Sequence, residues 1–231
     1  GARLFEIGRR YFRGEGGHSD EHATLGLVLA GEKTPRGWAN GKAQGFDAYD
    51  AKAEALALLE AAGAPVDNLM VMGEAGTQFH PGQSATLPKK VLARFGALHP
   101  NTLKAFDIDG PVVAAEIFLD AIPEKKNAGF ARAVYSPPAL QPVMRDFAFL
   151  VDSTLPAGDL VKAVRGADKQ RIVDARIFDR FDGQGVPEGK TSLALEVTLQ
   201  PGEKSFTDEE LKALSDAVVK AAAKAGAELR A

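Results

Sequence analysis

In the run Lys190–Leu199, every second residue from Leu193 onward is a large apolar one, and this alternation constrains the fold more than any other pattern in the chain. The apolar members are Leu193, Leu195, Val197 and Leu199. A period of two predicts a β-strand with one buried face and one face that is open to water or to a partner. The sequence therefore predicts a sheet that helices cover on one side only.

The segments around this strand complete an order of elements. Thr207 and Glu210 form a capping box, in which each side chain satisfies a backbone N–H group of the other residue, and this box predicts the start of a helix. The predicted elements are, in chain order, a strand at 146–151, a helix at 156–166, strands at 171–181 and 190–199 joined by a hairpin loop, a helix from 207 and a strand at 227–230. The order β-α-β-β-α-β is that of the ferredoxin-like fold.

The first half of the chain predicts several short strands and one helix. Alanine and leucine recur at helical spacing over residues 50–62, and the glycines at 14, 16 and 17 indicate a turn. The strand candidates are residues 2–8, 23–30, 69–72, 84–87, 91–95 and 112–119. One helix among many strands predicts an antiparallel sheet in an α+β domain. The Pro- and Lys-containing stretch 123–142 separates the halves, so we place the domains at 1–133 and 134–231.

Composition and charge exclude several kinds of functional site. The 231 residues contain no cysteine, which excludes disulfides, thiolate metal sites and cysteine nucleophiles. The formal net charge is −3, with 15 cations to 16 carboxylates in residues 1–134 and 13 to 15 in residues 135–231. The charge therefore gives no sign of a nucleic-acid partner. No apolar run is long enough to span a membrane and no signal peptide is evident, so we expect a cytoplasmic protein, and the apolar start suggests a piece of a longer one.

No pattern in the sequence predicts a catalytic residue or a metal site. His18 and His22 have helical metal-ligand spacing, but glycines precede them and a third ligand is missing, so we expect a solvated loop. His80 and His99 each precede a proline, which favours a role in turns. A phosphate-binding glycine loop and a nucleophile elbow are both absent from the sequence, and Asp107 and Asp109 are expected in a surface loop.

The open face of the predicted C-terminal sheet is the candidate binding surface. Ser192 lies on it by alternation, Lys190 is in phase with Ser192, and Phe181 ends the neighbouring strand. An aromatic ring beside small polar groups and cations can stack a nucleobase, at about 1–3 kcal/mol per base. The alternative is that Phe181 belongs to the core, and the strand phase favours this alternative, because Ala175 and Ile177 share its parity.

Several segments together resemble one family, the β subunit of bacterial phenylalanyl-tRNA synthetase in its C-terminal part. They are Leu4-Phe5-Glu6-Ile7-Gly8, Phe46-Asp47 with Asp50-Ala51-Lys52, His80-Pro81-Gly82-Gln83-Ser84-Ala85, Gly96-Ala97-Leu98-His99-Pro100, Arg145-Asp146-Phe147-Ala148-Phe149, Phe178-Asp179-Arg180-Phe181-Asp182-Gly183, Pro187-Glu188-Gly189-Lys190-Thr191-Ser192-Leu193 and Thr207-Asp208-Glu209-Glu210. Their order and spacing match the family over essentially the whole chain.

The resemblance implies a non-catalytic class II synthetase-like domain up to residue 133, which packs against a catalytic α subunit, and a ferredoxin-fold anticodon-binding domain from residue 134. It implies tRNA(Phe) as partner, a heterotetramer of two α and two β subunits, and ATP and Mg²⁺ as cofactors of the complete enzyme but not of this chain. It also implies that Phe181, where tyrosine is common, stacks on an anticodon base. Asp179, Ser192, Lys190 and Arg180 complete the predicted anticodon-contact set.

Two other functions remain open at this point. A structural module would contact only proteins, and exposed apolar residues on the open sheet face would favour it. An independent enzyme would need an acid or base in a pocket, for which the sequence gives no sign. Because the C-terminal half is not basic, any RNA contact is predicted to be weak, selective and dependent on stacking.

Overall fold

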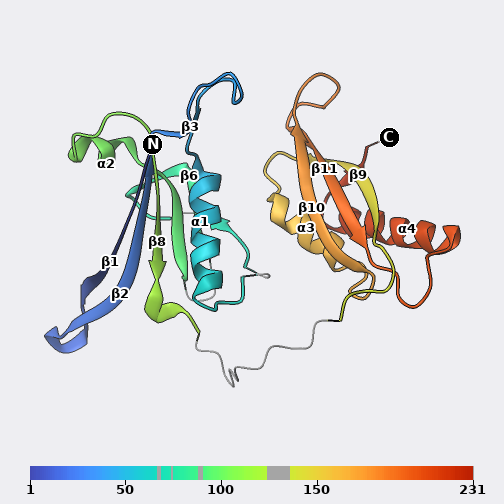
Figure 1. The fold of residues 1–231 in the computed structure, drawn as a ribbon, viewed down its shortest axis with the longest axis horizontal. Helices are drawn as coiled ribbons and strands as arrows, with labels where there is room; N and C mark the ends of the chain where they lie inside the picture. The colour runs from blue at the N-terminus through green and yellow to red at the C-terminus, as the bar shows by residue number, and fades with distance from the viewer. Residues whose placement is uncertain (67–68, 74, 88–90, 124–135, 231) are drawn as a thin grey trace. The chain divides into compact units, whose positions relative to one another are not determined.

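The computed structural model describes residues 1–66, 69–73, 75–87, 91–123 and 136–230. The chain divides into two compact units, residues 1–130 and 131–231 (Figure 1). Each unit has its own hydrophobic core. The predicted domain boundary at 133/134 falls within residues 124–135, outside the described residues.

The first unit contains a six-stranded sheet in which all neighbouring strands are antiparallel. In spatial order its strands are β1 (Ala2–Arg13), β2 (Ser19–Ala30), β8 (Val112–Phe118), β7 (Ala93–Leu98), β6 (Phe79–Leu87) and β5 (Met72–Gly73). A separate pair is formed by β3 (Glu32–Thr34) and β4 (Gln44–Gly45). Single 3₁₀ turns lie at Glu15–Gly17, between β1 and β2, and at Leu119–Ala121. The prediction of an antiparallel α+β domain is confirmed.

Helix α1 (Ala48–Ala61) covers one face of this sheet (Figure 1). It buries Ala51, Ala55 and Leu59 completely against the apolar side chains of the sheet. Asp47 caps its N-terminus, because its carboxylate accepts hydrogen bonds from the backbone N–H groups of Tyr49 and Asp50. The helix begins two residues before the predicted start. Its capping box consists of two aspartates, Asp47 and Asp50, whereas the capping box predicted in the second half of the chain consists of Thr207 and Glu210.

Asp50 links this cap to the β3–β4 pair. Its carboxylate accepts a hydrogen bond from Lys33 Nζ at 2.5 Å and another from the backbone N–H of Asp47 at 3.0 Å. The hydrogen bond from Lys33 lowers the pKa of Asp50 below its ordinary value, and the Asp47 N–H group lowers this pKa further. The ionised carboxylate is thus the form that the folded state favours.

We expect Asp50→Asn to destabilise the first unit in a pH-dependent way. Since the folded-state pKa of Asp50 is depressed, its contribution is present above the unfolded-state value of about 4 and is lost as pH falls through the folded-state pKa. The difference in urea midpoint between the original chain and the variant should be largest at neutral pH and shrink on acidification. In a chain that carries Lys33→Met, the effect of Asp50→Asn on the urea midpoint should be similarly small. An effect of Asp50→Asn that does not depend on pH would contradict this role of the Asp50 carboxylate.

Gly96 allows strands β6 and β7 to approach closely. Its φ is +141°, and a Cβ at this position would lie 2.3 Å from the carbonyl oxygen of Gln83 and 2.5 Å from Cα of Ser84. Both obstacles are backbone atoms, which cannot move aside without disturbing the pairing of Ser84 with Gly96. The position therefore requires glycine for its conformation and for the space around it.

Gly96→Ala should lower the free energy of unfolding of the first unit by about 3 kcal/mol or more, because it combines backbone strain with a clash. Gly26→Ala is the matched control, since Gly26 lies in β2 with no atom within 4 Å of its Cβ position and no positive φ. We expect the control to change stability by about 1 kcal/mol or less. Urea denaturation of both variants measures the difference, and equal losses would refute this role of Gly96.

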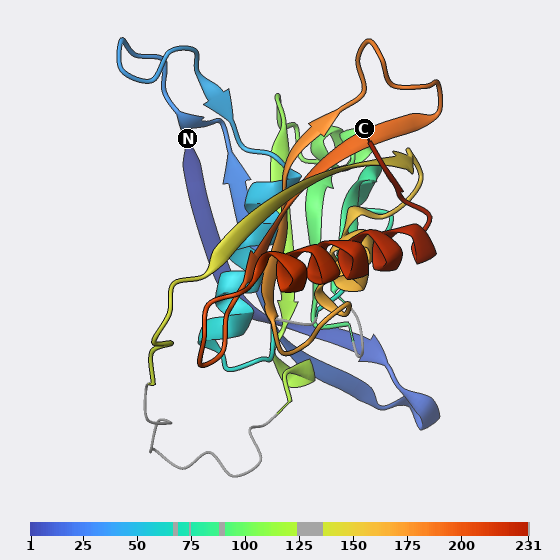
Figure 2. The same ribbon diagram turned by 90° about the vertical axis from the view of Figure 1, so that its right-hand side faces the viewer.

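The second unit has a four-stranded antiparallel sheet with helices on one face (Figure 2). In spatial order the strands are β10 (Ile172–Phe181), β11 (Lys190–Leu199), β9 (Val143–Asp152) and β12 (Glu228–Leu229). Helices α3 (Ala157–Arg165) and α4 (Asp208–Lys224) contribute Leu160, Val164, Val218 and Ala222 to the core. The predicted β-α-β-β-α-β order is confirmed, and so is the capping box of Thr207 and Glu210.

One helix was not predicted. Helix α2 (Pro100–Ala105) has six residues, too few to show helical periodicity. It begins where the sequence predicted only a turn, with Pro100 in its first turn and the His99 side chain accepting a hydrogen bond from the N–H of Asn101. The helix therefore depends on local capping of its N-terminus and not on an apolar stripe along one of its faces.

Candidate nucleic-acid interface

Two β-bulges in β10 decide which side chains reach the open face of the second sheet. The pairing of β10 with β11 shifts between Ile172 and Asp174 and again between Ile177 and Asp179. The second shift leaves Phe178 without an opposite residue. A residue inserted into one strand reverses the inward and outward alternation that follows it.

The second bulge carries Phe181 to the open face. Ile177 lies opposite Leu195, a core residue, whereas Phe181 lies opposite Ser192, which alternates away from the core. Phe181 is 44% exposed. The parity argument that favoured a core position for Phe181 is therefore wrong, because it assumed an uninterrupted strand.

The open face around Phe181 consists of two adjacent rows. Phe181, Ser192, Leu150 and Glu228 form one row across the four strands. In the next row Asp179 lies opposite Ala194, which lies opposite Ala148, and the N–H of Arg230 donates to the Ala148 carbonyl oxygen at 2.7 Å. The two alanines make the middle of the face shallow, so long side chains from the edges can meet above it.

Arg230 is the side chain that crosses this shallow floor. Its Nη1 donates a hydrogen bond to Ser192 Oγ at 3.2 Å, and its Cζ lies 5.9 Å from the centroid of the Phe181 ring. This distance is within the range of a cation–π contact. An aromatic ring and a guanidinium from opposite sheet edges thus come together over Ser192, which is buried beneath them. Arg230 was absent from the sequence prediction.

The other predicted site residues do not all lie on the open face of the sheet. Asp179 lies on the open face, where one carboxylate oxygen accepts from the N–H of Arg180 at 2.9 Å. Lys190 also lies on the open face, but its Nζ is paired with Asp152 at 2.9 Å. Arg180 lies opposite the core residue Leu193, on the other side of the strand, and pairs with Asp182 at 2.9 Å. The structure therefore brings Phe181, Ser192 and Asp179 together and leaves Arg180 out.

Most cations of the open face are neutralised within the unit. Arg176 donates to Glu196 at 2.8 Å, and this hydrogen bond raises the pKa of Arg176 above its ordinary value. Lys190 is paired with Asp152 as described. Within the described part of the chain, Arg230 has no carboxylate partner and is the open-face cation left to meet a ligand.

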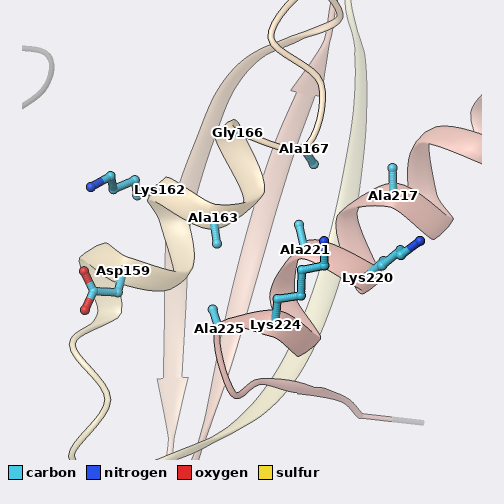
Figure 3. Close-up of a pocket in the computed structure, with 10 residues that line it drawn as sticks. All are labelled: Asp159, Lys162, Ala163, Gly166, Ala167, Ala217, Lys220, Ala221, Lys224 and Ala225. Carbon is cyan, nitrogen blue, oxygen red and sulfur yellow. The ribbon is translucent and has the colours of Figure 1, made fainter.

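A groove lies between α3 and α4, on the helix-covered side of the unit (Figure 3). It has a volume of about 650 Å³, with alanines on its floor and Lys162, Lys220 and Lys224 at its rim. None of the described residues that line it is aromatic, so they offer no surface for base stacking. The open sheet face is the better candidate for a nucleic acid.

The histidines contribute to turns, to a helix cap and to a contact with a carboxylate in the described structure. His80 Nδ1 accepts from the N–H of Gly82 at 3.1 Å, and His99 caps α2. His22 lies in strand β2 and faces Asp120, with 3.5 Å between Nδ1 and Oδ2, while His18 follows the turn at residues 15–17. Asp107 lies in a turn with φ +55°. Among the described residues no group of three or more His, Asp or Glu side chains is placed to hold a metal ion, and no helix is long and apolar enough to cross a membrane.

Comparison with known families agrees with this geometry. Residues 138–230 match the model of the ferredoxin-fold anticodon-binding domain. The second unit is therefore similar to the ferredoxin-fold anticodon-binding domain.

Residues 1–119, more than half of the chain, match the model of the phenylalanyl-tRNA synthetase beta chain CLM domain. The chain belongs to the phenylalanyl-tRNA synthetase β chain family. The phenylalanine–tRNA ligase β subunit of Novosphingobium aromaticivorans is 71% identical over 99% of this chain, and that of Zymomonas mobilis is 54% identical over the same share. The β subunit of Bradyrhizobium diazoefficiens is 42% identical. The chain spans 29% of the length of each of these relatives.

Proposed function

We propose that the second unit binds the anticodon region of tRNA(Phe) through the open face of its sheet. The observation that carries this proposal is the half-exposed Phe181 ring beside the Arg230 guanidinium. The ring supplies a stacking surface, Arg230 has N–H groups left to donate, and the second carboxylate oxygen of Asp179 can accept from a base edge. Phenylalanine in place of tyrosine keeps the stacking surface but supplies no hydroxyl.

The low charge of the face supports a selective contact. Since Arg176 and Lys190 are already paired with carboxylates, the face has little positive charge for phosphates. Its binding energy must then come mainly from stacking and base-edge hydrogen bonds. Most phosphate neutralisation would fall to other parts of a complete phenylalanine–tRNA ligase.

The first unit is proposed as a class II synthetase-like, non-catalytic scaffold that packs against the catalytic α subunit. Its edge strand β1 pairs only with β2 among the described strands, and the β1–β2 hairpin extends past the rest of the sheet (Figure 1). Leu4, Phe5, Ile7 and Tyr11 of β1 are each more than 60% exposed. An exposed apolar edge strand favours burial against a protein partner.

The complete enzyme is proposed to be a cytoplasmic heterotetramer of two α and two β subunits that uses ATP and Mg²⁺. The described residues of this chain do not provide a set of carboxylates and histidines for a metal ion. Their proposed part is to bind tRNA and to hold the catalytic subunit.

Phe181→Ala in the 231-residue chain should weaken binding of the tRNA(Phe) anticodon stem-loop by about 1–3 kcal/mol, the value of one stacked base. Fluorescence anisotropy at low salt measures the affinity. Arg230→Ala should also weaken binding, by about 1.5–3 kcal/mol, because it removes a charged donor. Lys190→Ala is the comparison variant and should have a smaller effect, since Asp152 already pairs with this ammonium group.

Unchanged affinity in both Phe181→Ala and Arg230→Ala would refute the interface. That result would favour the alternative function, a structural module that contacts only proteins. Because both side chains are partly exposed, their removal should leave the thermal midpoint nearly unchanged.

Phe5→Glu should weaken association with the catalytic α subunit by about 2 kcal/mol or more, if this exposed ring is buried in the complex. Phe106→Glu is the matched control, because Phe106 is equally exposed in the same unit but follows α2. Titration of each variant against the α subunit measures the loss. Equal effects of the two substitutions would argue against β1 as the contact.

A further inference from the structure

The hairpin loop between β10 and β11 lies against the Phe181 ring at Gly183. A Cβ at Gly183 would lie 2.5 Å from Cζ and 2.8 Å from Cε2 of Phe181. These distances are shorter than any ordinary van der Waals contact. The loop backbone therefore touches the ring at a point where only a hydrogen atom fits.

The backbone conformation of Gly183 does not itself require glycine. Gly183 is not among the glycines with positive φ, whereas its loop neighbours Gly185 and Gly189 are, at +92° and +77°. An alanine at 183 would thus be free of backbone strain. The three atoms nearest to its Cβ position all belong to the far end of the Phe181 side chain.

A side chain at position 183 would displace the Phe181 ring without disturbing the fold. The ring ends a flexible side chain, and Phe181 is 44% exposed and is the last residue of β10, so the ring can rotate away at small cost. Rotation would take the ring from its place 5.9 Å from Arg230 Cζ, above Ser192. The stacking surface would then no longer adjoin the free donors of Arg230.

We infer that Gly183 is a positioning residue of the RNA interface: by lacking a side chain, it lets the Phe181 ring remain beside Arg230 in the orientation that stacks a base. This inference rests on the proposed anticodon-binding function and assigns Gly183 no contact with RNA. Gly183 differs in this respect from Gly185 and Gly189, where a positive φ is by itself a sufficient reason for glycine.

The test is a double-mutant cycle in the 231-residue chain, with Phe181→Ala, Gly183→Ala and the double variant titrated against the tRNA(Phe) anticodon stem-loop. Gly158→Ala is the control, since Gly158 in α3 has no atom within 4 Å of its Cβ position. Gly183→Ala should bind at least about fivefold more weakly, the lower end of the loss of one stacked base. Its thermal midpoint should match that of the control.

The double variant should bind like Phe181→Ala alone, because Gly183 acts only through the ring. Full affinity of Gly183→Ala beside a weakened Phe181→Ala would overturn the positioning role and leave the interface intact. Full affinity of Phe181→Ala would overturn the inference, because the ring would then contribute nothing to binding, and full affinity of both Phe181→Ala and Arg230→Ala would overturn the proposed function. A further loss of affinity or of thermal midpoint on adding Gly183→Ala to Phe181→Ala would show that Gly183 acts on something other than the ring, and would also overturn the inference.

Discussion

The candidate interface depends on one backbone irregularity, the β-bulge at Phe178. Without this extra residue, Asp179 and Phe181 would alternate toward the helix-covered face, and Arg180 would lie toward the open one. The bulge reverses this order over the last three residues of β10. A local insertion in one strand thereby exchanges an arginine for an aromatic ring on the binding surface.

The surface combines low charge with a small number of available groups. Cross-strand ion pairs neutralise Arg176 and Lys190, while Arg230 alone among the described open-face cations is held by a neutral hydroxyl, that of Ser192. Ser192 and the two alanines beside it are small, and this lets the side chain of Arg230, the residue after β12, reach a ring on β10 across two intervening strands. The acidic pI of the chain is compatible with RNA binding on these terms, because stacking and edge recognition need few net charges.

Much of the fold was predictable, because its signals are local. The capping box at Thr207, the alternation of Lys190–Leu199 and the helical spacing that produced α1 each involve residues within a few positions of one another. Helix α2 escaped prediction because six residues are too few for a periodic pattern. Arg230 was not predicted, because a single arginine next to a short strand has no recognisable sequence pattern. Only its pairing with Ala148 places it beside Phe181.

The sequence by itself determined the order of elements in the second unit, the family, and the choice of Phe181, Asp179 and Ser192 as candidates, since periodicity, helix caps and ordered motifs are properties of neighbouring residues. The tertiary structure alone decided which face Phe181 occupies, that Arg180 lies on the other side, that Arg230 joins the ring and that Gly183 lies against it. The physical reason is that each of these facts depends on cross-strand register or loop packing. A single unpaired residue changes that register while leaving the local sequence pattern unchanged.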